Sequence, residues 1–89
     1  MARVRIPTQL RQLTDGQSEV DADGVTIGAL IDDLESSYPG LQERLLQDGR
    51  LRRFVNVYVE DEDVRFLDGL GTPVPAGVVV SIIPAVAGG

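Results

Sequence analysis

The sequence of 89 residues contains no cysteine, no histidine, no tryptophan and no lysine. Without cysteine the chain has no disulfide and no thiolate nucleophile, which fits a reducing cytoplasm. Without histidine it lacks the commonest metal ligand and general base. Because no side-chain amine is present, the chain cannot be the lysine acceptor in a polymer of its own copies. These absences argue against an enzyme, and we expect no catalytic residue, no metal and no bound cofactor.

Positive charge and long apolar runs are also scarce. Eight basic residues, all arginine, stand against fourteen acidic ones, for a net charge of −6. Proteins that bind nucleic acid are usually basic, so we expect no nucleic-acid partner. No run approaches the roughly 18 apolar residues of a membrane span, and the N-terminus lacks a signal-peptide core, so we expect a cytoplasmic protein without a membrane partner. The hydrophobic content of 43% is that of an ordinary folded domain.

The first half of the chain predicts a hairpin followed by a helix. Apolar residues alternate with charged ones over 2–6 and again over 19–22, which predicts two antiparallel strands joined by a long loop. Thr26 stands where a helix N-cap belongs. The apolar stripe of an amphipathic helix then follows and stops at Pro39-Gly40; it consists of Ile27, Leu30, Ile31, Leu34 and Tyr38. Leu41, Leu45 and Leu46 predict a short second helix that is capped near Gly49.

The second half predicts strands. Valines alternate with other residues over 54–59, and we expect the valines to face the core. Residues 60–63 form an acidic turn, 64–66 a short edge strand, and 68–73 an irregular crossing. The apolar run 78–83 is typical of a strand that is covered on both faces or lies in mid-sheet. One main helix must then cover one face of a single sheet, with the first and last strands side by side at its centre.

Residues 85–89 differ from everything before them, because they are small and end in two glycines after Pro84. We expect residues 1–84 to form the domain and 85–89 a flexible tail. Glycine has no Cβ, so such a tail fits a narrow cleft, and five residues reach at most about 17 Å. The alternative is a frayed terminus without a role. The predicted site is the carboxyl terminus at Gly88 and Gly89, presented to a partner's active site by Ala85, Val86 and Ala87.

Several motifs together resemble a known family. They are Asn56 within a valine-rich strand, the run Gly77-x-x-Val80-x-Ile82, and the ending from Pro84 to Gly-Gly. With the element order, they resemble the ubiquitin-like sulfur carriers of the MoaD/ThiS family. The resemblance implies an α+β, β-grasp fold with a mixed four- to five-stranded sheet packed on one main helix. The stretches 53–56 and 61–66 and the tail are similar to the actinobacterial carriers of cysteine biosynthesis.

The resemblance also implies partners and chemistry. An adenylyltransferase/sulfurtransferase similar to ubiquitin-activating enzymes would adenylate the carboxylate of Gly89, using ATP that the partner binds. A sulfur donor would then displace AMP and leave a thiocarboxylate. A sulfur-accepting synthase, either dependent on pyridoxal phosphate or making a thiosugar, would take the sulfur. In the cysteine pathway a metallopeptidase would trim the tail.

Three alternatives stay open from the residues. The first is a carrier with another product, either the small subunit of molybdopterin synthase or a carrier for another sulfur-containing metabolite. The second is a ubiquitin-like protein modifier. The third is a non-covalent binding module that does not need Gly88-Gly89.

Three other features have two interpretations each. The carboxylates of 60–63 form a metal site or, as such runs usually do, a solvated turn. The arginines 50, 52 and 53 bind phosphate or an acidic partner, or are plain surface charge. Phe66 and Leu67 belong to the core or to an exposed docking patch.

Overall fold

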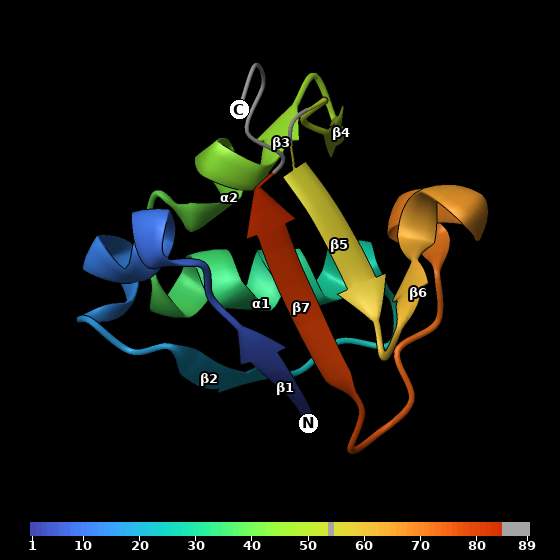
Figure 1. Cartoon of the computed structure of the whole chain (residues 1–89), viewed down its shortest axis with the longest axis horizontal. Coiled ribbons are helices and arrows are strands. Elements are labelled where there is room, and N and C mark those ends of the chain that lie inside the picture. Colours follow the sequence, from blue (N-terminus) through green and yellow to red (C-terminus); the bar gives the residue numbers. More distant parts are fainter. Residues whose placement is uncertain (54, 85–89) are drawn as a thin grey trace.

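The computed structural model describes residues 1–53 and 55–84, and its main feature is a five-stranded sheet packed on one long helix (Figure 1). The sheet order is β2-β1-β7-β5-β6. The strands are β1 (Ala2–Arg5), β2 (Glu19–Ala22), β5 (Val55–Val59), β6 (Glu62–Asp63) and β7 (Val79–Pro84). The helices are α1 (Ile27–Ser37) and α2 (Leu41–Leu45), with the 3-10 helices η1 (Thr8–Thr14), η2 (Val64–Phe66) and η3 (Gly69–Gly71).

The last strand lies at the centre of the sheet, as the apolar run predicted. β7 pairs in parallel with β1, with Val4 opposite Val80, and antiparallel with β5, with Val57 opposite Ile82. β1 and β2 form the predicted antiparallel hairpin. The sheet is therefore mixed, and the arrangement is the β-grasp fold.

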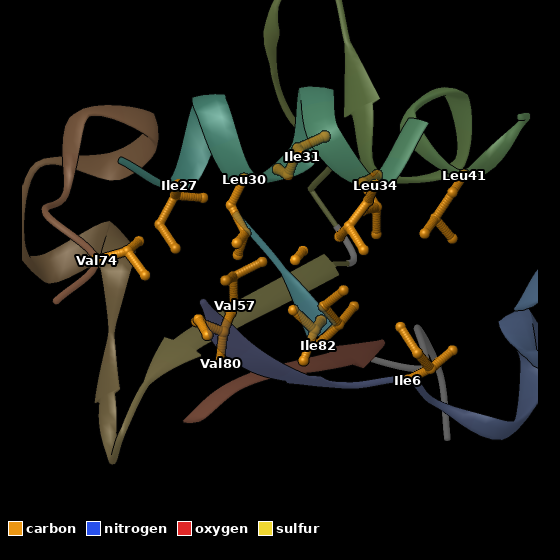
Figure 2. Packing of buried hydrophobic residues seen from close by; sticks show 14 of the residues in the cluster. Ile6, Ile27, Leu30, Ile31, Leu34, Leu41, Val57, Val74, Val80 and Ile82 are labelled. Atoms are coloured by element: carbon orange, nitrogen blue, oxygen red, sulfur yellow. The ribbon is translucent and has the colours of Figure 1, made fainter. Parts of the chain in front are cut away.

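The core lies between α1 and one face of the sheet (Figure 2). Leu30 and Leu34 of the helix point toward Val57 and Ile82 of the sheet. Alternation along each strand brings every second side chain to this face, and the 3.6-residue period of α1 supplies the opposing stripe. The expectation for the valines of β5 is confirmed for Val55 and Val57, which are buried, whereas Val59 is half-buried.

The cap predicted for α1 is present. The hydroxyl of Thr26 accepts a hydrogen bond from the backbone N–H of Ala29 at 3.2 Å, which satisfies one of the helix's free donors. Gly24 passes so close to the helix that a Cβ built on it would lie 2.3 Å from the backbone nitrogen of Leu30. Glycine at this position therefore sets how closely the β2–α1 connection can pack.

The prediction for residues 64–66 is wrong. Residues 64–66 form the 3-10 helix η2 and not an edge strand, because the carboxylate of Asp63 accepts the N–H of Arg65 at 2.8 Å and Val64 turns into the core. The edge strand is β6, made from the second half of the acidic run. The loop between β1 and β2 also contains a 3-10 helix, η1.

The second helix is shorter than predicted, and Gly49 does not cap it. The helix α2 ends at Leu45, and a second, two-stranded ribbon follows, with β3 (Leu46–Gln47) paired to β4 (Arg50–Leu51). Asp48 and Gly49 form the two-residue loop of this hairpin and have φ of 54° and 78°. Positive φ at both central residues is the geometry that favours Asp-Gly in tight hairpins.

Candidate functional site

The predicted tail begins where β7 ends, and the structure fixes that starting point. Pro84, the last described residue, lies opposite Val55, and Ile83 lies opposite Asn56. β7 is paired on both edges as far as Ser81, and its last residues are held by β5, which continues the pairing up to Pro84. We call this end of the molecule, defined by Pro84, Val55 and residues 52–53, the exit end. The predicted site residues Ala85, Val86, Ala87, Gly88 and Gly89 lie outside the described residues.

A hydrogen-bond cluster around Arg65 supports the exit end. One guanidinium nitrogen of Arg65, Nη2, lies within hydrogen-bond distance of the carbonyl oxygens of Arg52, Arg53 and Val55, at 2.7, 3.0 and 2.6 Å. The other nitrogen, Nη1, donates to the side-chain oxygen of Asn56 at 2.5 Å. The cluster therefore connects η2 to the residues that lead into β5, next to Pro84.

The structure brings together the stretches 53–56 and 61–66, which sequence analysis used only to identify the similarity to a family. Asn56 and Arg65 lie nine residues apart in the chain, and neither was predicted to have a role in the site. The fork of the guanidinium suits this task, because it carries several donors in a fixed plane. An arginine shortly after a predicted acidic turn was the available signal, but three of its four partners are backbone carbonyls, which a residue pattern does not reveal.

The arginines predicted as a candidate cluster also lie at the exit end. Arg50 belongs to β4, and Arg52 and Arg53 follow it directly before β5. The Nε of Arg52 donates to the carbonyl oxygen of Glu43 at 3.0 Å, so this side chain is partly structural. Arg50 and Arg53 are exposed.

The other candidate residues of the sequence analysis differ in how exposed their side chains are. Phe66 and Leu67 are not core residues, since they are 87% and 43% exposed. Ile83, on the sheet face that α1 leaves uncovered, is 48% exposed. In the acidic run, Glu60 and Asp61 form the turn that leads into β6, and both are exposed.

Two searches of the described part of the chain gave negative results. Within residues 1–53 and 55–84, no three carboxylates gather closely enough to hold a metal ion. In the same ranges, no helix has the length and apolar character needed to cross a bilayer.

Comparison with known proteins places these features in context. The model of the ThiS family matches residues 4–89. The sulfur carrier protein CysO of Mycobacterium tuberculosis is 56% identical over 89 residues, covering 97% of this chain and 96% of that protein. The small archaeal modifier protein 3 of Haloferax volcanii is 42% identical over 67 residues, which cover 75% of this chain and 73% of the modifier.

A solved structure agrees over the whole length. The crystal structure of the BexX/CysO complex from Amycolatopsis orientalis contains a chain with a TM-score of 0.96 and 49% identity, and the match covers 100% of both chains. The agreement confirms the predicted fold class.

Proposed function

The chain belongs to the ThiS family, and on that premise we propose that it is a sulfur carrier protein that works through the carboxyl group of Gly89. The observation that supports this most directly is the 56% identity with the sulfur carrier protein CysO, which extends over nearly the full length of both chains. The prediction that the chain is not an enzyme agrees with this relationship, because a carrier is the substrate of its partner enzymes.

The exit end supports the proposal because it gives the tail a fixed starting point on the folded domain. A carrier must present its reactive end at a defined distance from a firm body, so that binding of the body places the end in the partner's cleft. Here β7 pairs with β1 as far as Ser81 and with β5 as far as Pro84. We propose residues 1–84 as the body and 85–89 as the tail, whose five residues reach at most about 17 Å.

The proposed chemistry has two steps. In the partner's active site, a carboxylate oxygen of Gly89 attacks the α-phosphorus of ATP, which expels pyrophosphate and gives an acyl-adenylate. A sulfide equivalent from the sulfur donor then attacks the acyl carbon and expels AMP, leaving a thiocarboxylate. The chain has no thiol of its own, so this sulfur gives it an anionic soft nucleophile that its side chains do not provide. Transfer of the sulfur to an acceptor and hydrolysis return the carboxylate.

The partners follow from these steps. We propose an ATP-dependent adenylyltransferase/sulfurtransferase in the cytoplasm and a sulfur-accepting synthase that makes cysteine or another sulfur-containing metabolite. ATP is bound by the first partner and not by this chain. A tail-processing metallopeptidase is needed only if the product is released while still joined to the carrier.

Mass spectrometry of the intact protein tests the proposal. The purified chain, incubated with its adenylating enzyme, ATP and sulfide, should gain the mass difference between sulfur and oxygen at its C-terminus. The Gly89→Ala variant should be adenylated at least about 10-fold more slowly, because the added methyl group must enter a cleft shaped for glycine. Gly71→Ala carries the same chemical change away from the tail and should react normally. Unimpaired adenylation of Gly89→Ala would contradict the proposal.

A second candidate function is a ubiquitin-like protein modifier, and the identity with the small archaeal modifier protein 3 favours it. Both functions share adenylation and differ afterwards. A modifier isolated from cells would appear as adducts on the lysines of target proteins, whereas a carrier would appear as the free thiocarboxylate.

A further inference from the structure

Six of the eight arginines lie in two parts of the molecule with different surroundings. Arg3 and Arg5 lie on β1 and pair with Glu19 or Asp21 across the hairpin, at 3.4 to 3.6 Å. Four others lie together on the segment that leads from α2 through the β3–β4 hairpin to β5. These four, which we call the basic rim, are Arg44, Arg50, Arg52 and Arg53.

The guanidinium groups of the basic rim form no ion pair among the described residues. Among the described residues, no carboxylate lies within 4 Å of any of its four guanidinium groups. Two open grooves that share Arg52 run across this surface, of about 540 and 520 Å³. Glu43 and Asp48 line the same grooves, and both are exposed.

The charge of the rim is opposite to that of the rest of the chain. Residues 43–53 contain four arginines and two acids, for a net +2, so the remaining residues carry −8 of the total of −6. Four clustered like charges repel one another, which costs stability unless a partner compensates for it. Residues that only keep the chain soluble would not need to gather the positive charge in one place.

The rim lies beside the exit end. Arg52 and Arg53 lie three and two residues before Val55, which is opposite Pro84, and their carbonyl oxygens belong to the Arg65 cluster. Figure 1 shows the end of β7 next to the start of β5, at the same end of the molecule as α2, β3 and β4. A surface that binds the rim would therefore border any cleft that receives the tail.

From this placement we infer that the basic rim docks on an acidic protein surface at the mouth of the active site of the adenylating partner. The inference rests on the proposed function and adds the chemistry of the partner's surface. The rim sets the encounter and orientation of the carrier, while the tail reaches the reacting groups. Nucleic acid fits less well, because the −8 on the rest of the chain repels a long polyanion.

A pair of variants with equal net charge tests the inference. In the rim variant, Arg44→Gln, Arg50→Gln and Arg53→Gln remove three positive charges from exposed side chains that make no hydrogen bond among the described residues. Arg52 is kept because of its bond to Glu43. In the control variant, Gln9→Glu, Gln12→Glu and Gln17→Glu add three negative charges at exposed positions in and just after η1. Both variants reach a net charge of −9.

The assay measures kcat and KM for ATP-dependent adenylation of each variant, at roughly 50 mM and 300 mM NaCl. We expect the KM of the rim variant to rise about 10-fold at low salt, with kcat unchanged, and the difference to shrink at high salt. The control should stay within about twofold of the wild type. Lysine in place of the three arginines keeps the charges and should restore KM, provided that circular dichroism shows all variants folded.

Two results would overturn the inference. Equal KM values for the rim and control variants would show that local charge has no role. Loss of nucleic-acid binding in the rim variant, without any change in KM, would show that the rim serves a different partner. If the wild-type chain itself is not adenylated, the proposed function fails, and the inference fails with it. If the wild-type chain is adenylated but the rim and control variants have equal KM values, only the inference fails.

Discussion

Removal of the Arg65 side chain should weaken the exit end by an amount that the geometry allows us to estimate. Nη2 carries two hydrogens but faces three carbonyl oxygens, so the cluster holds at most three full hydrogen bonds, including the one from Nη1 to Asn56. Each net bond contributes about 0.5–1.5 kcal/mol, and because Arg65 is exposed, water replaces part of each. We therefore expect Arg65→Ala to lower the free energy of unfolding by about 2 kcal/mol.

The measurement is urea unfolding followed by far-ultraviolet circular dichroism. A loss of this size corresponds to a fall in Tm of about 8–16 °C for a domain of this length. Arg65→Lys should recover less than half of the loss, because an ammonium group cannot reach Asn56 and the carbonyls of 52–55 from one position. Hydrogen exchange should localise the effect, since the N–H of Val55, bonded to Arg52 at 3.0 Å, should lose protection first.

Arg53→Ala is the matched control. It removes the same charge from a neighbouring exposed side chain that makes no hydrogen bond among the described residues, and it should change stability by less than about 0.5 kcal/mol. If Arg65→Ala were as stable as Arg53→Ala, the cluster would be a feature of the surface without a supporting role.

Two further predictions concern the packing on α1. Leu34→Ala, at a side chain only 1% exposed, should cost about 2–5 kcal/mol in unfolding free energy, whereas Val25→Ala, at 79% exposure, should cost under about 0.5 kcal/mol; equal losses would contradict the assignment of the core. Gly24→Ala should cost about 1–3 kcal/mol by thermal unfolding, since its Cβ would meet the backbone of Leu30 at 2.3 Å. Gly71→Ala, whose Cβ would meet only Asp68 at 3.9 Å, should be close to neutral, and similar losses for both glycines would disprove the clash.

The long elements could be predicted because burial on one face gives them a period. Within each long strand or helix, the apolar residues follow the spacing of that element and so share one face. The structure buries an example from each of β1, α1 and β7, namely Val4, Leu30 and Val80. The central place of β7 also followed from its sequence, since a strand paired on both edges tolerates few polar residues.

The short elements could not be predicted, because local contacts decide them. The strands β3 and β4 have two residues each, too few to show a period, and Gly49 fits a helix cap as well as a hairpin loop. At 64–66, the capping hydrogen bond that the carboxylate of Asp63 accepts from the N–H of Arg65 outweighed the strand-forming tendency of Val64.

The candidate site was predicted only in part. Sequence analysis noticed the arginines and predicted a tail over 85–89, which lies outside the described residues, but the Arg65 cluster depends on backbone carbonyls brought together by the fold. The lack of ion pairs at the basic rim, within the part of the chain that the structure describes, likewise depends on where the fold places the carboxylates, and only the structure shows that.

The parallel pairing of β1 with β7 has a consequence for how the molecule is made. The ribosome synthesises Ala2 early and Pro84 late, so the centre of the sheet cannot close until nearly all of the chain described here has left the exit tunnel. Pairings between such distant residues also slow folding. A truncated translation product that lacks β7 would lack Val80 and Ile82 from its core, and would remain open to proteolysis. The proposed adenylating partner would therefore meet finished chains and few incomplete ones.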